Sequence, residues 1–362
     1  MFIKRVWRLA LALSFASPAR AATGVESLLL ATMLPPAQSY RGTLEVSAGG
    51  QAHSKIVEVS EDPGRGVRRE ILDRLGLPSV TIISDGETEW VYDRARSIAW
   101  RGEPADPDLK LLDPDEEMDL LLSNYEVREA GSERIAGLEC RVLEIWSRPG
   151  ASEASRKIRR LCVEAESGLV LLKVSFDAAG ERMSSVRFLR LELAPKLSER
   201  TFVFRPPSGV EIRENRLRPD YMRLEEAAAA TALRPRPPTW LPSGFLFESV
   251  NLLAYRGTTI LHYRYSDGID ALSVFQAPRG TRLKFPGDGP RPFAVGSVRG
   301  ELALGSGGKT LTWSAGDRFV IVGRVPAESL RRIAESVPET GPDPEESDAG
   351  LIDLGGVEEA FP

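Results

Sequence analysis

Apolar and polar residues alternate in short runs along most of the chain, and this period of two is typical of half-buried β-strands. About a dozen such runs fall between residues 40 and 204, where few segments have a helical period. Asp85-Gly86 separates two of the runs and predicts a tight hairpin, because both residues tolerate positive φ. A sheet of this size must curl or close. We therefore predict a mainly β (α+β) fold with a large, curled antiparallel sheet, or half-barrel.

Helical segments are few, and they are expected to cover this sheet. Residues 24–34 carry an apolar face, and a second helix is predicted to begin at Asp113, which Pro114 and Glu116 follow. Asp113 can cap the helix, Pro114 fits its first position, and Glu116 can reach back to the capping residue. These roles explain the acidic cluster without a metal ion.

Composition divides the rest of the chain into domains. A short predicted helix and a proline-rich run make residues 219–239 a linker, because proline imposes an extended backbone. The first domain is then 22–218, with the large sheet. The second is 240–338, a smaller α/β domain. Residues 339–362 are acidic and rich in proline and glycine, which predicts a disordered tail.

The first residues have the order of a secretory signal peptide. Lys4, Arg5 and Arg8 precede an apolar run that is too short to span a bilayer, and Ala19-Arg20-Ala21 offers a small-x-small cleavage site. We predict that the signal peptide, residues 1–21, is cleaved near Ala21 and that the mature protein is exported and soluble. An amphipathic helix that stays attached is the alternative interpretation.

The charge distribution argues against nucleic acid as a partner. The formal net charge is −5, and eight acidic residues, with no basic residue among them, lie beyond Val337. Without these residues and the basic signal segment, the chain is close to neutral. A neutral body has no global field that would attract nucleic acid.

The chain contains two cysteines, Cys140 and Cys162, and in an oxidising compartment such a pair predicts a disulfide. Residues 139–146 and 158–164 both have strand patterns, and a symmetric hairpin would place the two cysteines directly opposite each other. Opposed Cβ atoms lie at about the separation that a disulfide requires. A redox-active pair is disfavoured because the C-x-x-C spacing is missing.

Enzyme chemistry finds little support in the sequence. The two histidines, His53 and His262, lie far apart, and a zinc site would need scattered carboxylates as well. The glycine-rich segment 305–310 lacks the first glycine of a phosphate-binding loop and leads into a predicted strand. We predict a binding protein that is not an enzyme, with no metal site and no cofactor, although carboxylate pairs for acid–base work stay open.

Two groups of residues are candidates for binding. An apolar cavity on one face of the sheet would accept an acyl chain, and the competing interpretation is that the same residues form the core. Its candidate members are Leu44, Val46, Val80, Ile82, Trp90, Tyr92 and Trp100. A basic patch would hold phosphates or an acidic peptide, and the competing interpretation is a solvated strand face. Its candidate members are Arg156, Lys157, Arg159 and Arg160.

Five motifs, in this order, resemble a known family. They are GSERIAGLEC (131–140), SGLVLL (167–172), WLPSGF (240–245), YSDGIDALSVF (265–275) and VIVGRVP (320–326). Together they make the chain similar to the MucB/RseB-type periplasmic regulators of the envelope-stress sigma factor. The chain departs from that family in its long acidic tail.

The resemblance implies a LolA-like half-barrel for the first domain and a location in the periplasm. It also implies that the chain binds the periplasmic part of a single-span anti-sigma factor and shields it from a site-1 protease. Lipid, lipopolysaccharide or a lipoprotein acyl chain would relieve this protection, and a homo-oligomer stays open. The alternative function is a periplasmic lipid or lipoprotein carrier of LolA type.

Overall fold

The computed structural model of the 362-residue chain describes residues 24–48, 54–104, 112–148, 154–214, 222–255, 258–284, 288–305, 308–339 and 351–353. The predicted signal peptide and all but four residues of the predicted tail lie outside the described residues. Within the described ranges, no helix has the length and apolar character needed to cross a membrane.

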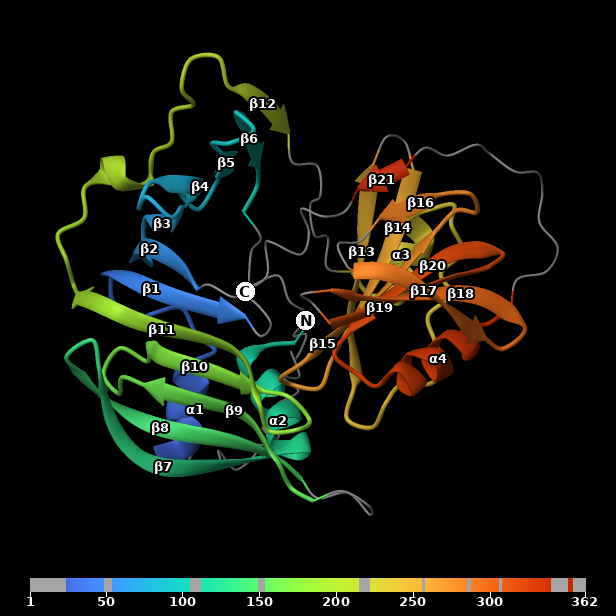
Figure 1. The fold of residues 1–362 in the computed structure, drawn as a ribbon, viewed down its shortest axis with the longest axis horizontal. Helices are drawn as coiled ribbons and strands as arrows, with labels where there is room; N and C mark the ends of the chain where they lie inside the picture. Colours follow the sequence, from blue (N-terminus) through green and yellow to red (C-terminus); the bar gives the residue numbers. More distant parts are fainter. Residues whose placement is uncertain are drawn as a thin grey trace, which may run out of the picture.

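Twelve strands form one large, curled sheet that stays open (Figure 1). They are β1 (Tyr40–Ala48), β2 (Lys55–Asp62), β3 (Gly66–Leu72), β4 (Pro78–Ser84), β5 (Glu89–Asp93), β6 (Ile98–Gly102), β7 (Tyr125–Ile135), β8 (Leu138–Ser147), β9 (Lys157–Val163), β10 (Val170–Phe176), β11 (Arg182–Leu193) and β12 (Glu211–Glu214). The spatial order is β12-β6-β5-β4-β3-β2-β1-β11-β10-β9-β8-β7. Neighbours are antiparallel except β12 and β6, so the predicted large antiparallel sheet is confirmed.

The turn at Asp85-Gly86 shows why the β4–β5 hairpin forms where the sequence predicts it. Gly86 has a φ of +91°, a conformation that costs a glycine little. One carboxylate oxygen of Asp85 accepts hydrogen bonds from the backbone N–H groups of Glu87 and Thr88, at 3.0 and 2.7 Å. The aspartate thus closes the turn from its own side chain.

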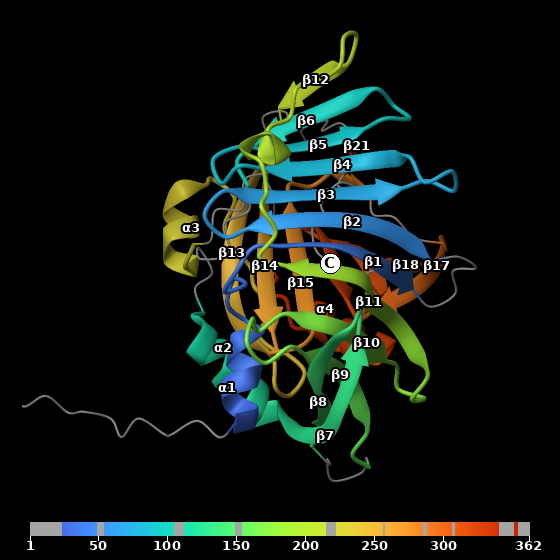
Figure 2. The same cartoon turned by 90° about the vertical axis from the view of Figure 1, so that its left-hand side faces the viewer.

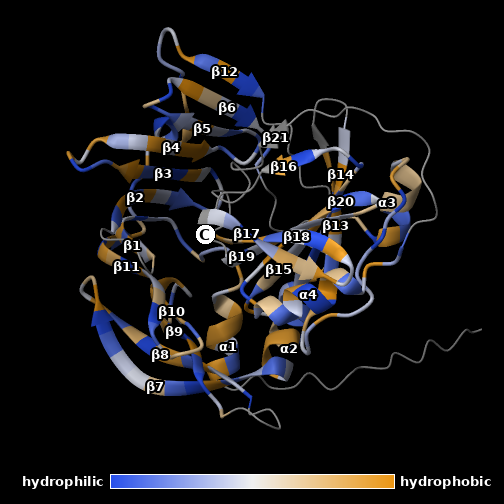
Figure 3. Ribbon diagram, turned by 45° about the vertical axis from the view of Figure 1, so that its right-hand side comes forward, coloured by the Kyte–Doolittle hydropathy of each residue, from blue (hydrophilic) through white to orange (hydrophobic). Residues whose placement is uncertain are grey.

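Two helices cover one end of the large sheet. α1 (Gly24–Ala31) is mostly apolar, as Figure 3 shows, and buries Leu28 and Leu29 against β8 and β9. α2 (Pro114–Asn124) begins with the predicted capping box. The Asp113 side chain accepts from the Glu116 N–H at 2.8 Å, while the Asp113 N–H donates to the Glu116 carboxylate at 3.0 Å.

Seven further strands form a small antiparallel sheet. They are β13 (Leu246–Tyr255), β14 (Thr258–Ser266), β15 (Ala271–Ala277), β17 (Asp288–Val295), β18 (Val298–Gly305), β19 (Gly308–Ala315) and β20 (Asp317–Gly323), in the spatial order β13-β14-β15-β20-β19-β18-β17. Two helices, α3 (Leu224–Ala230) and α4 (Ala327–Glu335), pack against this sheet's main core. Within it, the rings of Trp313 and Phe319 stack 5.1 Å apart. This smaller sheet with helices confirms the predicted fold class.

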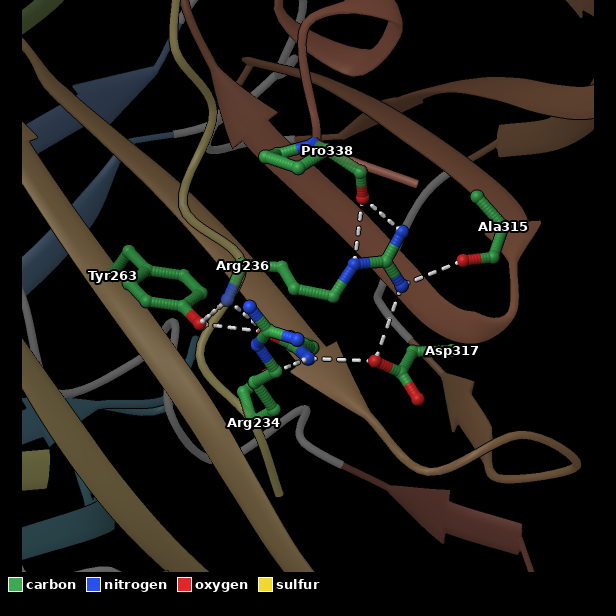
Figure 4. A network of polar contacts seen from close by, with 7 residues as sticks. Arg234, Arg236, Tyr263, Ala315, Asp317 and Pro338 are labelled. Atoms are coloured by element: carbon green, nitrogen blue, oxygen red, sulfur yellow. Dashed lines mark hydrogen bonds and ion pairs between the residues drawn. The ribbon is translucent and has the colours of Figure 1, made fainter. Parts of the chain in front are cut away.

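The proline-rich run is held tightly against the small sheet by Arg236, which is 3% exposed (Figure 4). Its backbone N–H donates to the Tyr263 hydroxyl at 2.9 Å. Its guanidinium donates to the carbonyl oxygens of Ala315 (2.7 Å) and Pro338 and pairs with Asp317 at 3.3 Å. The segment is therefore fixed to the end of α4 rather than swinging as a free spacer.

A two-stranded parallel pair completes the sheets. β16 (Arg282–Lys284) pairs with β21 (Leu351–Asp353). β21 falls within residues 339–362, the tail that the sequence predicts to be disordered. An unpaired strand edge offers N–H and C=O groups to any extended segment, and here β21 takes them.

Cys140 and Cys162 form a disulfide between β8 and β9, with Cα atoms 5.4 Å apart. The predicted register is wrong by two residues, because Cys162 lies opposite Val142 and Cys140 is its diagonal neighbour. A bulge opposite Ile145 and Trp146 contributes to this shift, since it makes the hairpin asymmetric about its loop.

Candidate binding surface

The large sheet has an inner face, toward the small sheet, and an outer face, away from it (Figure 2). Arg159 defines the inner face, because its guanidinium donates to the carbonyl of Ile269 beside the small sheet at 3.4 Å. Lys173 lies on the same face, opposite Val186 of β11, and Val186 lies opposite Val46 of β1. The inner face therefore runs without a break from β9 across β10 and β11 to β1.

Five of the seven candidate cavity residues share this inner face. The strand register places Leu44, Val46, Val80, Ile82 and Trp100 there, all of them half-buried. Trp90 and Tyr92 lie on the outer face, so the prediction of one shared face is wrong for them. Side chains alternate along β5, and Val91 takes the inner position between Ile82 and Trp100.

On the outer face, the aromatic residues of β5 pack under the chain that follows β11. Phe204 lies 5.4 Å from the ring of Trp90 and 5.6 Å from that of Tyr92. It follows a 3₁₀ turn, η2 (Glu199–Phe202), where Phe202 is buried. Trp90 and Tyr92 thus help to hold a covering segment and do not line the inner face.

A depression of about 680 Å³ opens beside η2, and two of its four arginines, Arg68 and Arg190, have partners. The guanidinium of Arg68 donates to Glu70 at 2.7 Å and to the Thr201 carbonyl at 3.4 Å. Arg190 donates to the Thr43 hydroxyl at 3.2 Å. Three glutamates among the lining residues balance most of the positive charge, so we do not place a binding site here.

The candidate basic patch is divided between the two faces of β9. Lys157 pairs with Glu144 at 2.5 Å, and Arg160 pairs with Glu133 at 2.6 Å. Both lie on the outer face, whereas Arg159 lies on the inner face, and Arg156 donates to the Asp177 carbonyl at 3.4 Å. The structure does not bring the four together as one surface, because strand neighbours point to opposite faces.

The two sheets meet where α2 and the start of β7 contact the β14–β15 turn. The Tyr125 hydroxyl donates to the Asp267 carboxylate at 2.6 Å. The Asn124 side chain donates to the carbonyls of Gly244 and Asp267, at 2.9 and 3.0 Å. Gly268 lies so close to Leu121 that an added Cβ would come within 2.6 Å of its backbone. We call these contacts the junction.

Charged side chains gather on the inner face beside the junction, and cations outnumber anions. Arg324, which follows β20, lies 3.8 Å from Asp270, and Arg159 approaches the same turn. Lys173, on the adjacent strand β10, lies opposite Leu161 and therefore diagonally from Arg159. Two carboxylates, Asp267 and Asp270, thus lie among these three cations, and Arg156 also acts on Asp270.

These charges shift one another's pKa values. Burial, together with the neighbouring cations Arg159 and Arg324, lowers the pKa of Lys173 to about 8. Burial also raises the pKa of Asp270, and the nearby Asp267 carboxylate adds to the rise. The cations destabilise one another, and an additional negative charge placed among them would relieve that repulsion.

In the sequence, Asp267-Gly268 has the pattern of a turn, and no pattern singles out Lys173 or Arg324. The turn role of Asp267 is real, because one carboxylate oxygen accepts from the N–H groups of Ile269 and Asp270 at 2.9 and 2.7 Å. Its other oxygen meets Tyr125, a contact between residues 142 positions apart. Local patterns carry no signal of such a contact.

His262 is a structural residue. It is buried, its ring stacks on Phe275 at 4.3 Å, and its Nε2 lies 2.9 Å from the Ser273 hydroxyl. Burial lowers its pKa to about 3, which keeps the ring neutral. The described ranges contain no group of three or more His, Cys, Asp or Glu side chains arranged to hold a metal ion, and His53 lies outside them.

Comparison with known proteins matches both the sequence and the fold. The family described as the MucB/RseB N-terminal domain matches residues 32–206. The crystal structure of MucB in complex with MucA(peri) is similar, with 20% identity and a TM-score of 0.53, over 88% of this chain and 100% of that chain. The MucA/MucB complex of Pseudomonas aeruginosa gives the same identity and TM-score over 88% of this chain and 98% of that one. No curated protein sequence matches.

The structural likeness extends well beyond the family match, because 88% of the chain takes in both the large and the small sheet. At 20% identity this likeness establishes the fold, and the family match adds the relationship in sequence. The protein is thus of MucB/RseB type, with its MucB/RseB N-terminal domain over residues 32–206.

Proposed function

We propose that this chain is an exported regulatory protein that binds the periplasmic part of a single-span anti-sigma factor and controls its proteolysis. The observation that carries the proposal is the likeness, across both sheets, to structures of MucB in complex with MucA. The proposal includes that the chain acts by binding and is not an enzyme. The export signal and the division into domains 22–218 and 240–338 belong to the same proposal.

The inner face offers a surface suited to such a partner. Leu44, Val80, Ile82 and Trp100 are only half-buried, and a contiguous apolar area that stays accessible favours an interaction site. The junction lies on the same side of the sheet, so a partner lying along the inner face would also reach the small sheet. Binding there would respond to any change in how the sheets meet.

We further propose that lipid or a lipoprotein acyl chain modulates this binding. An acyl chain would occupy the same apolar positions as the partner and thereby compete with it. The alternative, a lipid or lipoprotein carrier of LolA type, needs only the large sheet. The small sheet, fixed to the large one through the Tyr125–Asp267 contact, favours the regulator.

The test is crosslinking of the tagged full-length protein in its own cells, followed by mass spectrometry of the captured proteins. We expect capture of a single-span membrane protein encoded beside a sigma factor. Ile82→Asp on the inner face should reduce that capture, whereas Leu75→Asp, at a residue 84% exposed in a loop, should not. Capture of lipoproteins or lipid alone would replace the regulator with the carrier.

A further inference from the structure

We infer that the inner-face cations beside the junction form a binding site for an acidic peptide segment, with Lys173, Arg159 and Arg324 as its charged contacts. This inference rests on the proposed function, because it names the chemistry of the partner segment that would reach the small sheet. The three side chains come from β9, β10 and the end of β20, so the site exists only where the two sheets meet.

The first observation is a guanidinium with an unused donor. Arg159 Nε is buried and has no hydrogen-bond partner, although the same side chain reaches the Ile269 carbonyl through another nitrogen. A buried N–H of a charged group without an acceptor is costly, and most such groups in proteins are paired. A carboxylate from a partner would supply the missing acceptor.

The second observation is the balance of charge. Asp267 is already satisfied by Tyr125 and by two turn amides, and Asp270 has Arg324 at 3.8 Å. Lys173 has neither an ion pair nor a hydrogen bond among the described residues, and both charges that act on it are cations. One positive charge is therefore left over in a half-buried place, where it attracts an anion more strongly than at an open surface.

The third observation is access. Arg324 is 36% exposed at the side-chain level, so the cluster opens to solvent at that end. From there the inner face continues over Val186 and Val46 toward Val80. A segment with acidic residues beside apolar ones fits this order of cations and aliphatic side chains. A phosphate headgroup would satisfy only the charged end of that surface.

The experiment measures binding of a fluorescein-labelled decaglutamate peptide to the full chain by fluorescence anisotropy at low salt. Lys173→Gln and Arg324→Gln should each weaken binding by about tenfold, the loss expected for one charge-assisted contact. Lys173→Arg keeps the charge and should keep binding. Arg160→Gln, on the outer face and paired with Glu133, should leave affinity within about twofold of wild type.

Three results would overturn the inference. Binding that is the same in Lys173→Gln and wild type would remove Lys173 from the site. If Lys173→Gln unfolds, and Lys173→Arg folds but does not bind decaglutamate, Lys173 has a structural role and is not a contact of the peptide. Lys173-dependent binding to phosphatidylglycerol vesicles, without binding to decaglutamate, would assign the site to lipid phosphate.

The same variants separate this inference from the proposed function. If wild type and Lys173→Gln capture the membrane partner equally well in cells, the proposed regulatory function stands and the acidic-peptide site is rejected. Decaglutamate binding by a chain that captures no membrane partner would keep the site and reject the regulator.

Discussion

At the scale of single residues, the side chains that matter most here have two roles at once. Asp267 closes the β14–β15 turn with one carboxylate oxygen and receives the Tyr125 hydroxyl with the other. The first role is local, and an Asp-Gly pair predicts it. The second depends on how two sheets come together, and neither residue's neighbours in sequence reveal it.

Tyr125→Phe should destabilise the protein by about 1–2 kcal/mol, because it removes a hydrogen bond to a buried charged group and keeps the ring in place. Asp267 retains its two turn amides, so the turn itself should survive. Urea denaturation measures the change. Tyr92→Phe is the matched control on the outer face, where no hydrogen bond of the hydroxyl is found among the described residues, and equal losses in the two variants would contradict the prediction.

The depressed pKa of Lys173 predicts a pH dependence of stability. The group is charged in the unfolded chain up to its ordinary pKa near 10.5, whereas in the folded protein it loses its proton from about pH 8. Between these values the unfolded state binds more protons, so this group adds stability as the pH rises.

Lys173→Met should therefore be more stable than wild type at pH 7, and its advantage should shrink between pH 8 and pH 9.5. Urea denaturation of wild type and Lys173→Met at each pH measures the difference between their free energies of unfolding. Both proteins contain the same tyrosines, so tyrosine titration cancels from this difference. A difference that does not change with pH would show that Lys173 has an ordinary pKa.

At the scale of elements, the sequence predicts what depends on neighbours in the chain. The capping box at Asp113 and the hairpin turn at Asp85-Gly86 both formed as expected, because each is closed by contacts within four residues. Register is different. A bulge in the β8–β9 hairpin contributes to the shift of Cys162 from its expected place opposite Cys140, and a pattern of alternating residues does not show where a bulge will fall.

The disulfide should stabilise the large sheet by about 3 kcal/mol, since it closes a loop of 22 residues in the unfolded chain. The Cys140→Ala/Cys162→Ala double variant should lose this amount in urea denaturation. Wild type with a reducing agent should move toward the variant, and the variant should not respond to the reagent. A response of the variant would mean that the reagent acts elsewhere.

Arg236 ties the proline-rich segment to the small sheet, and its replacement should be costly. Arg236→Met removes donors to the Ala315 and Pro338 carbonyls and leaves Asp317 without its guanidinium partner. We expect a loss of about 3 kcal/mol, the cost of breaking a buried pair. Arg234→Met is the control, because the Arg234 side chain is exposed and only its carbonyl takes part in the network.

At the scale of the whole molecule, the candidate site depends on two sheets being brought together. Composition and strand spacing predicted a large curled sheet and a smaller sheet after it, since each follows from local patterns. The split of the candidate cavity, with Trp90 and Tyr92 outside, could not be predicted without the register. Neither could the proximity of the like charges of Lys173, on the large sheet, and Arg324, at the end of the small sheet's β20.

Gly268 provides the test of how firmly the sheets are joined. Its φ of +91° disfavours any other residue, and a Cβ would also come within 2.6 Å of the Leu121 backbone in α2. Gly180 has a similar φ of +81° but nothing within 4 Å of an added Cβ. Alanine at either position meets the same backbone strain, about 1 kcal/mol, so the difference between the two variants reports the contact between the sheets alone.

Gly268→Ala should therefore loosen the junction while both sheets keep their own cores. Hydrogen exchange should become faster in α2 and in residues 266–270, with little change in β17 and β18, which β20 and β19 separate from the β14–β15 pair. The Tyr125–Asp267 bond should be lost with it, and decaglutamate affinity should fall because Arg324 moves away from Lys173. Equal exchange in Gly268→Ala and Gly180→Ala would mean that α2 yields to the added methyl group and that the sheets are held together by other contacts.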